Sequence, residues 1–118
     1  MSLDMSVFVR GVDDGTIESL LQKRFGVNFT STSGALVAEV FGVSIARVRD
    51  HELEEDCGIE YPRYPSQVSF TLYSGRIEPE SGSVLCASMA LAFARTLRME
   101  TGASYLVVEG MQRIVDAA

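Results

Sequence analysis

The chain carries at residues 67–73 the stretch QVSFTLY, in which polar and apolar side chains alternate. Val68, Phe70 and Leu72 share one parity, which is the pattern of a strand with one buried face. A strongly apolar segment follows at residues 84–94, with apolar side chains at helical spacing. A half-buried strand followed by such a helix predicts a sheet covered by helices, with this helix at the centre of the core.

The segments on either side of this pair predict the other elements of the domain. Strands are expected at residues 6–10, 27–30, 35–41, 43–49 and 105–108. A first helix is expected to begin at Asp13, Asp14 or Thr16, which can cap its amides, and to end at Gly26. For residues 44–55 a helix is the alternative to a strand, but its apolar face is poor.

These segments predict an α+β fold with the element order β-α-β-β-β-β-α-β. We expect a single mixed or antiparallel sheet of about five to six strands with two helices. The long helix is expected to start at Ser81 or Ser83, and residues 111–118 are expected to form a short terminal helix. Residues 6–118 are predicted to form a single domain, preceded at residues 1–5 by a disordered start or an expression remnant.

The net charge of the chain is confined to one segment. The 118 residues include 16 acids and 10 Lys or Arg, which gives a formal net charge of −6. Residues 50–60, DHELEEDCGIE, hold six of the acids and no base, so the remaining ten acids balance the ten bases. The sequence has no basic cluster, so we predict no nucleic-acid binding. No apolar run is long enough to predict a membrane segment, so we expect a cytoplasmic protein.

The acidic segment is predicted to be a binding loop. It continues into Pro62 and Pro65, which are expected to force an extended backbone and exclude helix. Long irregular connections in compact domains are usually functional, and a one-signed patch attracts partners of opposite charge. The predicted contact residues are Asp50, Glu52, Glu54, Glu55, Asp56, Glu60, Tyr61 and Tyr64. Alternatively, the two tyrosines only cover the sheet beneath the loop.

The same segment contains His51 and Cys57, which raises the question of catalysis or metal binding. The spacing of its ligand types matches neither a zinc site nor a calcium loop. The surrounding acids oppose formation of a thiolate at Cys57, and adjacent acids such as Glu54 and Glu55 in a hydrophilic loop rarely perform acid–base chemistry. Cys86 fits the helix pattern as a buried thiol. We predict no catalytic residue, no metal and no cofactor.

The acidic segment with Gly58–Tyr61 and Tyr64, the strand at 67–73 and the helix leading into Gly102–Val108 resemble small bacterial immunity proteins of polymorphic-toxin systems. The resemblance covers roughly residues 40–110. It implies a stoichiometric inhibitor that covers the basic active site of a toxin, often a nuclease, with acidic and aromatic side chains. It assigns no individual family residue to this chain.

The sequence therefore supports three hypotheses of function. The first is a non-catalytic protein-binding module, of the toxin-neutralising kind, that engages a basic partner through the acidic loop. The second is a small enzyme or ligand-binding domain with a pocket between helix and sheet, which a deep apolar pocket around His51 or Cys57 would favour. The third is a homo-oligomeric structural domain, for example a dimer that pairs through an exposed strand edge.

Overall fold

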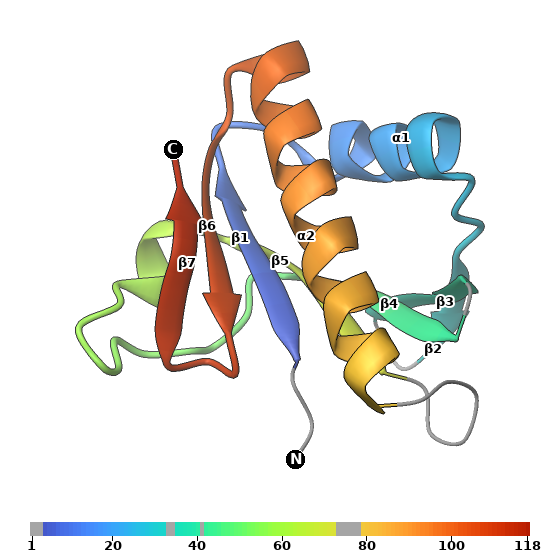
Figure 1. Cartoon of the computed structure of the whole chain (residues 1–118). Coiled ribbons are helices and arrows are strands. Elements are labelled where there is room, and N and C mark those ends of the chain that lie inside the picture. The colour runs from blue at the N-terminus through green and yellow to red at the C-terminus, as the bar shows by residue number, and fades with distance from the viewer. Residues whose placement is uncertain (1–3, 33–34, 41, 73–78) are drawn as a thin grey trace.

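In the part of the chain that the computed structural model describes, residues 4–32, 35–40, 42–72 and 79–118, seven strands form one antiparallel sheet (Figure 1). Two helices lie on one face of this sheet, so the predicted α+β class is confirmed. The element order is β-α-β-β-β-β-α-β-β, which adds one strand at the end of the predicted order. All strand pairs are antiparallel, and the mixed alternative is wrong.

The strands follow the order β2-β3-β4-β5-β1-β6-β7 across the sheet. They are β1 (Met5–Arg10), β2 (Thr30–Thr32), β3 (Ala35–Val40), β4 (Val43–Arg49), β5 (Ser66–Leu72), β6 (Ser104–Glu109) and β7 (Arg113–Ala117). The helices are α1 (Asp14–Phe25) and α2 (Pro79–Thr101), with a short 3-10 helix, η1 (Tyr61–Arg63), between β4 and β5. For residues 43–49 the predicted strand is confirmed over its helical alternative.

Strand β1 is an interior strand of the sheet, between β5 and β6, and is buried on both faces. Val7 and Val9 belong to the core beneath the helices, whereas Phe8 belongs to a second core on the opposite face. Each of these three side chains is at most 1% exposed. The uninterrupted apolar run in β1 therefore has a direct cause, because neither face of this strand meets water.

Helix α2 lies across one face of the sheet with α1 beside its second half (Figure 1). The buried residues between the helices and the sheet form the helix-side core. Its largest fully buried members are Ile17, Leu21, Ile45, Phe70, Phe93 and Leu97. The rings of Phe70 and Phe93 are 6.1 Å apart, which joins β5 directly to α2.

Helix α1 begins and ends at the residues predicted to cap it. The Asp13 carboxylate accepts a hydrogen bond of 2.7 Å from the Thr16 amide, and Gly26 adopts the left-handed conformation with φ 65°. The Thr16 hydrogen bonds lower the pKa of the Asp13 carboxyl, because they favour its charged form. The helix therefore begins one residue after Asp13 and ends one residue before Gly26.

Half-buried charges fix the start of α1 over the sheet. The Arg47 guanidinium on β4 contacts the carboxylates of Asp14 and Glu18, each at 2.6 Å. The Ser66 hydroxyl on β5 donates a 2.7 Å hydrogen bond to Asp14. Asp14 therefore ties α1 to two neighbouring strands through charge-assisted bonds.

The end of the described chain is a strand, so the predicted terminal helix at residues 111–118 is wrong. Gly110 and Met111 have positive φ values of 58° and 59°, which forms a tight turn between β6 and β7. Val107 pairs with Asp116 but Val108 pairs with Ile114, so the register shifts by one residue. This bulge removes the alternation by which a strand is recognised in a sequence.

Smaller differences have local causes. The strand predicted at residues 27–30 is replaced by β2, because the Val27 amide still donates to the Leu21 carbonyl at the end of α1. Helix α2 begins at Pro79, since proline is compatible with a first helical turn. Strand β1 already includes Met5. Residue 41 of the strand predicted at 35–41 and residue 73 of the strand predicted at 67–73 lie outside the described residues.

Candidate protein-binding site

The acidic segment connects β4 to β5 and folds back over the sheet face opposite the helices. It is the light green segment at the left of Figure 1. Its residues Ile59 and Tyr61 pack against Phe8, Leu106 and Val108, and these five buried residues form the loop-side core. Residues 50–65 are therefore called the acidic loop, and the sheet positions them through this core.

Polar contacts close the base of the acidic loop. The Asp50 amide donates a 2.8 Å hydrogen bond to the Pro65 carbonyl. The Leu53 amide donates to Nδ1 of His51 at 3.3 Å, and Nε2 of His51 lies 2.6 Å from the Tyr64 carbonyl. Because Nδ1 accepts from the Leu53 amide, Nε2 is the ring nitrogen that donates to the Tyr64 carbonyl. His51 therefore joins the two ends of the loop.

The tip of the acidic loop is a tight turn. Asp56 and Ile59 exchange backbone hydrogen bonds of 3.2 and 2.8 Å. Between them Cys57 and Gly58 have φ values of 51° and 76°. Two successive positive φ values are the signature of a type I′ turn, which glycine adopts freely and cysteine adopts at a cost. The turn directs Ile59 back towards the sheet.

Tyr61 anchors the loop to the sheet rather than standing exposed. Its side chain is 2% exposed, its ring centroid lies 4.7 Å from that of Phe8, and its hydroxyl donates a 2.9 Å hydrogen bond to the Met111 carbonyl. Burial, and then the neighbouring charge of Asp56, raise the pKa of the phenol. For Tyr61, the structure has the packing that the alternative interpretation describes.

Proline is compatible with the short helix at this point, which corrects the expectation that Pro62 and Pro65 exclude helical structure. Pro62 lies in the first turn of η1, where no amide proton is required. The following Tyr64 is half-buried, and the Arg10 guanidinium lies over its ring at 5.1 Å. Tyr64 is thus held against the end of β1.

The carboxylates of the loop fall into two groups. Asp50 lies 3.6 Å from Arg49, and Glu60 forms a 2.9 Å ion pair with Arg63. The exposed side chains of Glu52, Glu54, Glu55 and Asp56 have no ion pair within the described residues. The negative potential is therefore concentrated at these four groups, which are called the acidic rim.

The acidic rim surrounds a recess of about 510 Å³. The residues that line it are Leu53, Tyr61 and Met111, which have apolar side chains or rings, and the four acids of the rim. A recess with apolar walls and unpaired carboxylates suits a long cationic side chain, since the aliphatic stem and the charged head are both accommodated. The structure thus brings five of the eight predicted contact residues, the four acids of the rim and Tyr61, to one recess.

His51 and Cys57 do not combine into a reactive pair in this arrangement. Both ring nitrogens of His51 contact backbone groups, and Cys57 is an exposed free thiol at the turn. Neither residue lines the recess. Cys86 is buried in α2, and burial raises the pKa of its thiol. Among the described residues, no group of three or more His, Cys, Asp or Glu side chains is placed to hold a metal ion.

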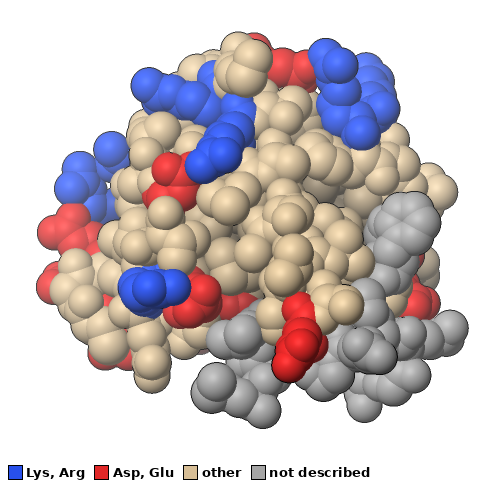
Figure 2. Space-filling view, in the orientation of Figure 1, with Lys and Arg blue, Asp and Glu red and all other residues tan. Residues whose placement is uncertain are grey.

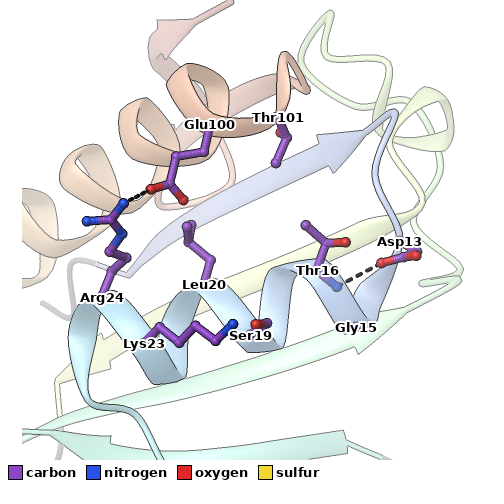
Figure 3. Close-up of a pocket in the computed structure, with 9 residues that line it drawn as sticks. All are labelled: Asp13, Gly15, Thr16, Ser19, Leu20, Lys23, Arg24, Glu100 and Thr101. Carbon is purple, nitrogen blue, oxygen red and sulfur yellow. Dashed lines mark hydrogen bonds and ion pairs between the residues drawn. The ribbon is translucent and has the colours of Figure 1, made fainter.

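A second cleft lies between α1 and the end of α2 (Figure 3). It has a volume of about 480 Å³, a floor formed by Leu20 and a polar lining that includes Ser19 and Lys23. The Arg24 guanidinium and the Glu100 carboxylate pair across it, and Asp13 is engaged by Thr16. The cleft thus contains charges of both signs, two of which form an ion pair, which distinguishes it from the acidic recess.

Two recess residues were missed by sequence reasoning. Leu53 is an apolar side chain between acids, and this contrast is a usable signal. Met111 reaches the recess from the β6–β7 turn, 50 positions from Tyr61, and no local pattern marks it. Its contribution depends on the strand pairing of β1 with β6 and of β6 with β7.

Within the described residues, neither α1 nor α2 combines the length and the apolar character needed to cross a membrane. Comparison of the chain with protein-family models, curated proteins and solved structures finds no match.

Proposed function

We propose that this chain is a non-catalytic binding module that engages a basic partner protein through the acidic rim. One observation carries the proposal: four exposed carboxylates without ion pairs within the described residues surround a recess with an apolar lining. Exposed acids on a free surface are usually dispersed and solvated. Here they surround a site that has room for a side chain of the partner.

The chemistry of the recess favours arginine or lysine as the group that enters it. The stem of either side chain can pack on Leu53 and Met111 while its charged head reaches the carboxylates. A guanidinium can pair with a carboxylate through two parallel hydrogen bonds, whereas an ammonium acts as a point charge. We therefore expect arginine to bind more tightly than lysine.

The attachment of the loop supports the same proposal. Ile59 and Tyr61 are buried at 3% and 2% exposure, and His51 joins the two ends of the loop. A loop held by such contacts loses little conformational entropy when a partner binds. Its charges can also accelerate the encounter, since the potential around the rim has one sign.

The partner we propose is a toxin with a basic active site, and the chain would neutralise it by occupying that site in the bacterial cytoplasm. A site that binds phosphate groups displays arginine and lysine side chains. The acidic rim presents carboxylates to the same cations. The resemblance to immunity proteins and the chemistry of the recess both point to this class of partner.

The proposal is tested with peptides of arginine, lysine or uncharged citrulline, titrated calorimetrically into the wild-type chain. We expect hexa-arginine to bind more tightly than hexalysine, citrulline not to bind, and Glu54→Gln/Glu55→Gln to weaken arginine binding by about tenfold. The control Glu39→Gln/Glu100→Gln removes the same number of exposed charges elsewhere and should change affinity less than twofold, a change of about 0.4 kcal/mol.

Equal weakening by the two double variants would show that only net charge attracts the peptide, and would overturn the site. Amide chemical shifts of Leu53 and Met111 provide a separate readout, because both residues line the recess. They should move with arginine and remain fixed with citrulline. The same pair of variants then discriminates among proteins captured from the source bacterium, since the true partner is lost only from the loop variant.

A further inference from the structure

Helix α2 has an uncharged surface that extends beyond the side buried in the monomer. Between Glu80 and Arg95 the sequence contains no charged residue. Residues such as Cys86, Ala90 and Phe93 face the sheet and are fully buried. The solvent side of a surface helix normally carries charged and strongly polar side chains. Within the described residues, however, the buried side of α2 is the one that faces the sheet and α1, and the opposite side is uncharged.

The uncovered side forms a continuous surface along the helix. Its residues recur at spacings of three and four, and Val84 among them is 68% exposed. Figure 2 shows the result as an uncharged area over the middle of α2, with charged groups around it. The surface consists of the exposed Ser81, Val84, Ser88 and Ala92 and the half-buried Leu85 and Leu91, and these six residues are called the α2 face.

We infer that the α2 face is a dimer interface, in which two copies of this chain associate with their α2 helices antiparallel. The proposal is independent of the acidic rim, which belongs to the loop-side face of the sheet. Exposed apolar side chains bordered by polar groups typically mark sites of protein association. The small side chains of Ser88 and Ala92 allow a second helix to approach closely.

The charges at the two ends of the α2 face identify a second copy as the occupant. Glu80 lies at one end and carries no ion pair within the described residues, while Arg95 lies at the other and is 62% exposed in its pair with Asp116. A two-fold axis at Ser88 brings the start of α2 in one copy beside the region of Arg95 in the other. Glu80 thereby lies beside the second copy's Arg95, and this occurs twice in the dimer.

The same axis also makes the uncharged contacts complementary. On one side of the interface it places Val84 beside Leu91 of the second copy, and on the other side it places Leu85 beside the small Ala92. Ser88 meets itself at the axis, where one hydroxyl can donate a hydrogen bond to the other. A partner of any other sequence would need acidic and basic groups at matching ends. In an antiparallel dimer the chain supplies them itself.

The first experiment measures the oligomeric state of the wild-type chain by sedimentation equilibrium up to millimolar concentration. We expect a monomer–dimer equilibrium, and expect Ser88→Glu to weaken it by about a hundredfold, because two like charges would meet at the axis. Ser88 is exposed in the monomer, so circular dichroism should show an unchanged fold. The control Ala117→Glu places the same charge on the edge strand β7 and should leave the equilibrium unchanged.

A charge exchange tests the ends of the interface. Glu80→Arg alone and Arg95→Glu alone should each weaken the dimer several-fold, whereas the double exchange should restore it, since the opposite charges meet again. If the loss of dimer affinity in the double variant equals the sum of the two single losses, Glu80 and Arg95 do not pair across the interface, and the antiparallel arrangement is wrong.

A cysteine at position 88 tests the two-fold axis itself, in a chain with Cys57→Ser. Helices that meet at small side chains lie about 8 Å apart, so Ser88→Cys brings two thiols within disulfide reach under oxidation. The matched variant Val84→Cys should not cross-link. Residue 84 lies four positions from the two-fold axis, so the two copies of it are about 12 Å apart along the direction of the helices.

A purely monomeric wild-type chain at millimolar concentration overturns the proposal, as does a dimer that Ala117→Glu dissociates and Ser88→Glu does not. The latter result would assign the interface to the strand edge. Neither outcome affects the binding of arginine peptides by the acidic rim, so failures of the two proposals are distinguishable.

Discussion

The two faces of the sheet are closed in different ways. On the helix side, α1 and α2 cover a core that draws on residues from β1, β3, β4, β5 and β6. On the loop side, a single loop without a long helix covers Phe8, Leu106 and Val108 with two of its own residues, Ile59 and Tyr61. One face is therefore held by many redundant contacts, and the other by a few contacts that also position the acidic rim.

This difference separates stability from function within one small sheet. Loss of a helix-side contact should weaken every element together, because the strands share that core. Loss of a loop-side contact should first release the loop, because the loop can detach while the helix-side core remains. The following changes test that division, from the largest expected effect to the smallest.

Phe93→Ala should have the largest effect. Its ring is fully buried between α2 and the sheet and contacts Phe25 and Phe70. We expect the free energy of unfolding to fall by about 3–5 kcal/mol, with cavity formation as the cause. Urea unfolding measures this loss, and hydrogen exchange should accelerate in all strands together. A change confined to α2 would contradict the shared core.

Ile59→Ala should release the acidic loop. Truncation of a buried isoleucine costs about 2–4 kcal/mol in a rigid core, but detachment of the loop limits the loss here. We expect faster hydrogen exchange at the Leu53 and Tyr64 amides and unchanged exchange in β1. The control Ile114→Ala removes the same group from a side chain that is 43% exposed and should leave loop exchange unchanged.

Asp116→Asn tests the polar attachment of β7 to the helix side. The Tyr105 hydroxyl donates to Asp116 at 2.8 Å and the Arg95 guanidinium at 3.2 Å, and the Tyr105 bond is the main cause that lowers the pKa of this carboxyl. A lowered pKa stabilises the folded state above the ordinary value of 3.8, and this stabilisation disappears as pH falls through the folded-state pKa.

We therefore expect Asp116→Asn to cost about 1 kcal/mol at neutral pH and almost nothing once the pH is below the folded-state pKa of the carboxyl. Urea unfolding of both chains across this range measures the difference. A difference that persists undiminished in acid would show that the carboxylate charge does not stabilise the strand.

Cys57→Asn should have the smallest effect and the opposite sign. Cys57 holds φ 51° before Gly58, and asparagine tolerates this conformation better than other side chains. We expect a gain of about 0.5 kcal/mol, with the loop tip more protected from exchange. The control Cys57→Ser also removes the thiol but lacks this preference, so it should show no gain.

The sequence predicted most of the helix-side architecture because local signals and burial agree there. Asp13 and Gly26 cap α1 as their chemistry requires, and the alternation Val68, Phe70 accurately marks β5. The terminal strand β7 was missed because its bulge places Val115 outside the alternation. The start of β2 was misplaced because Val27 still bonds to the helix end.

The site was predicted as a charged loop but not as a recess. Charge and proline content marked its position, whereas the burial of Tyr61 and the arrival of Met111 depend on contacts between distant segments. No property of residues 50–65 alone indicates that they cover Phe8. That relation exists only after β1, β5 and β6 have paired.

The position of β1 between two strands that come later in the chain has a consequence for folding during synthesis. β1 is made before both of its neighbours, for Met5 pairs with Phe70 on one side and with Glu109 on the other. On the ribosome its apolar residues thus wait until nearly the whole described chain has emerged, and such non-local pairing is intrinsically slow. During this interval Val7, Phe8 and Val9 form an exposed apolar segment of the kind that chaperones protect from aggregation.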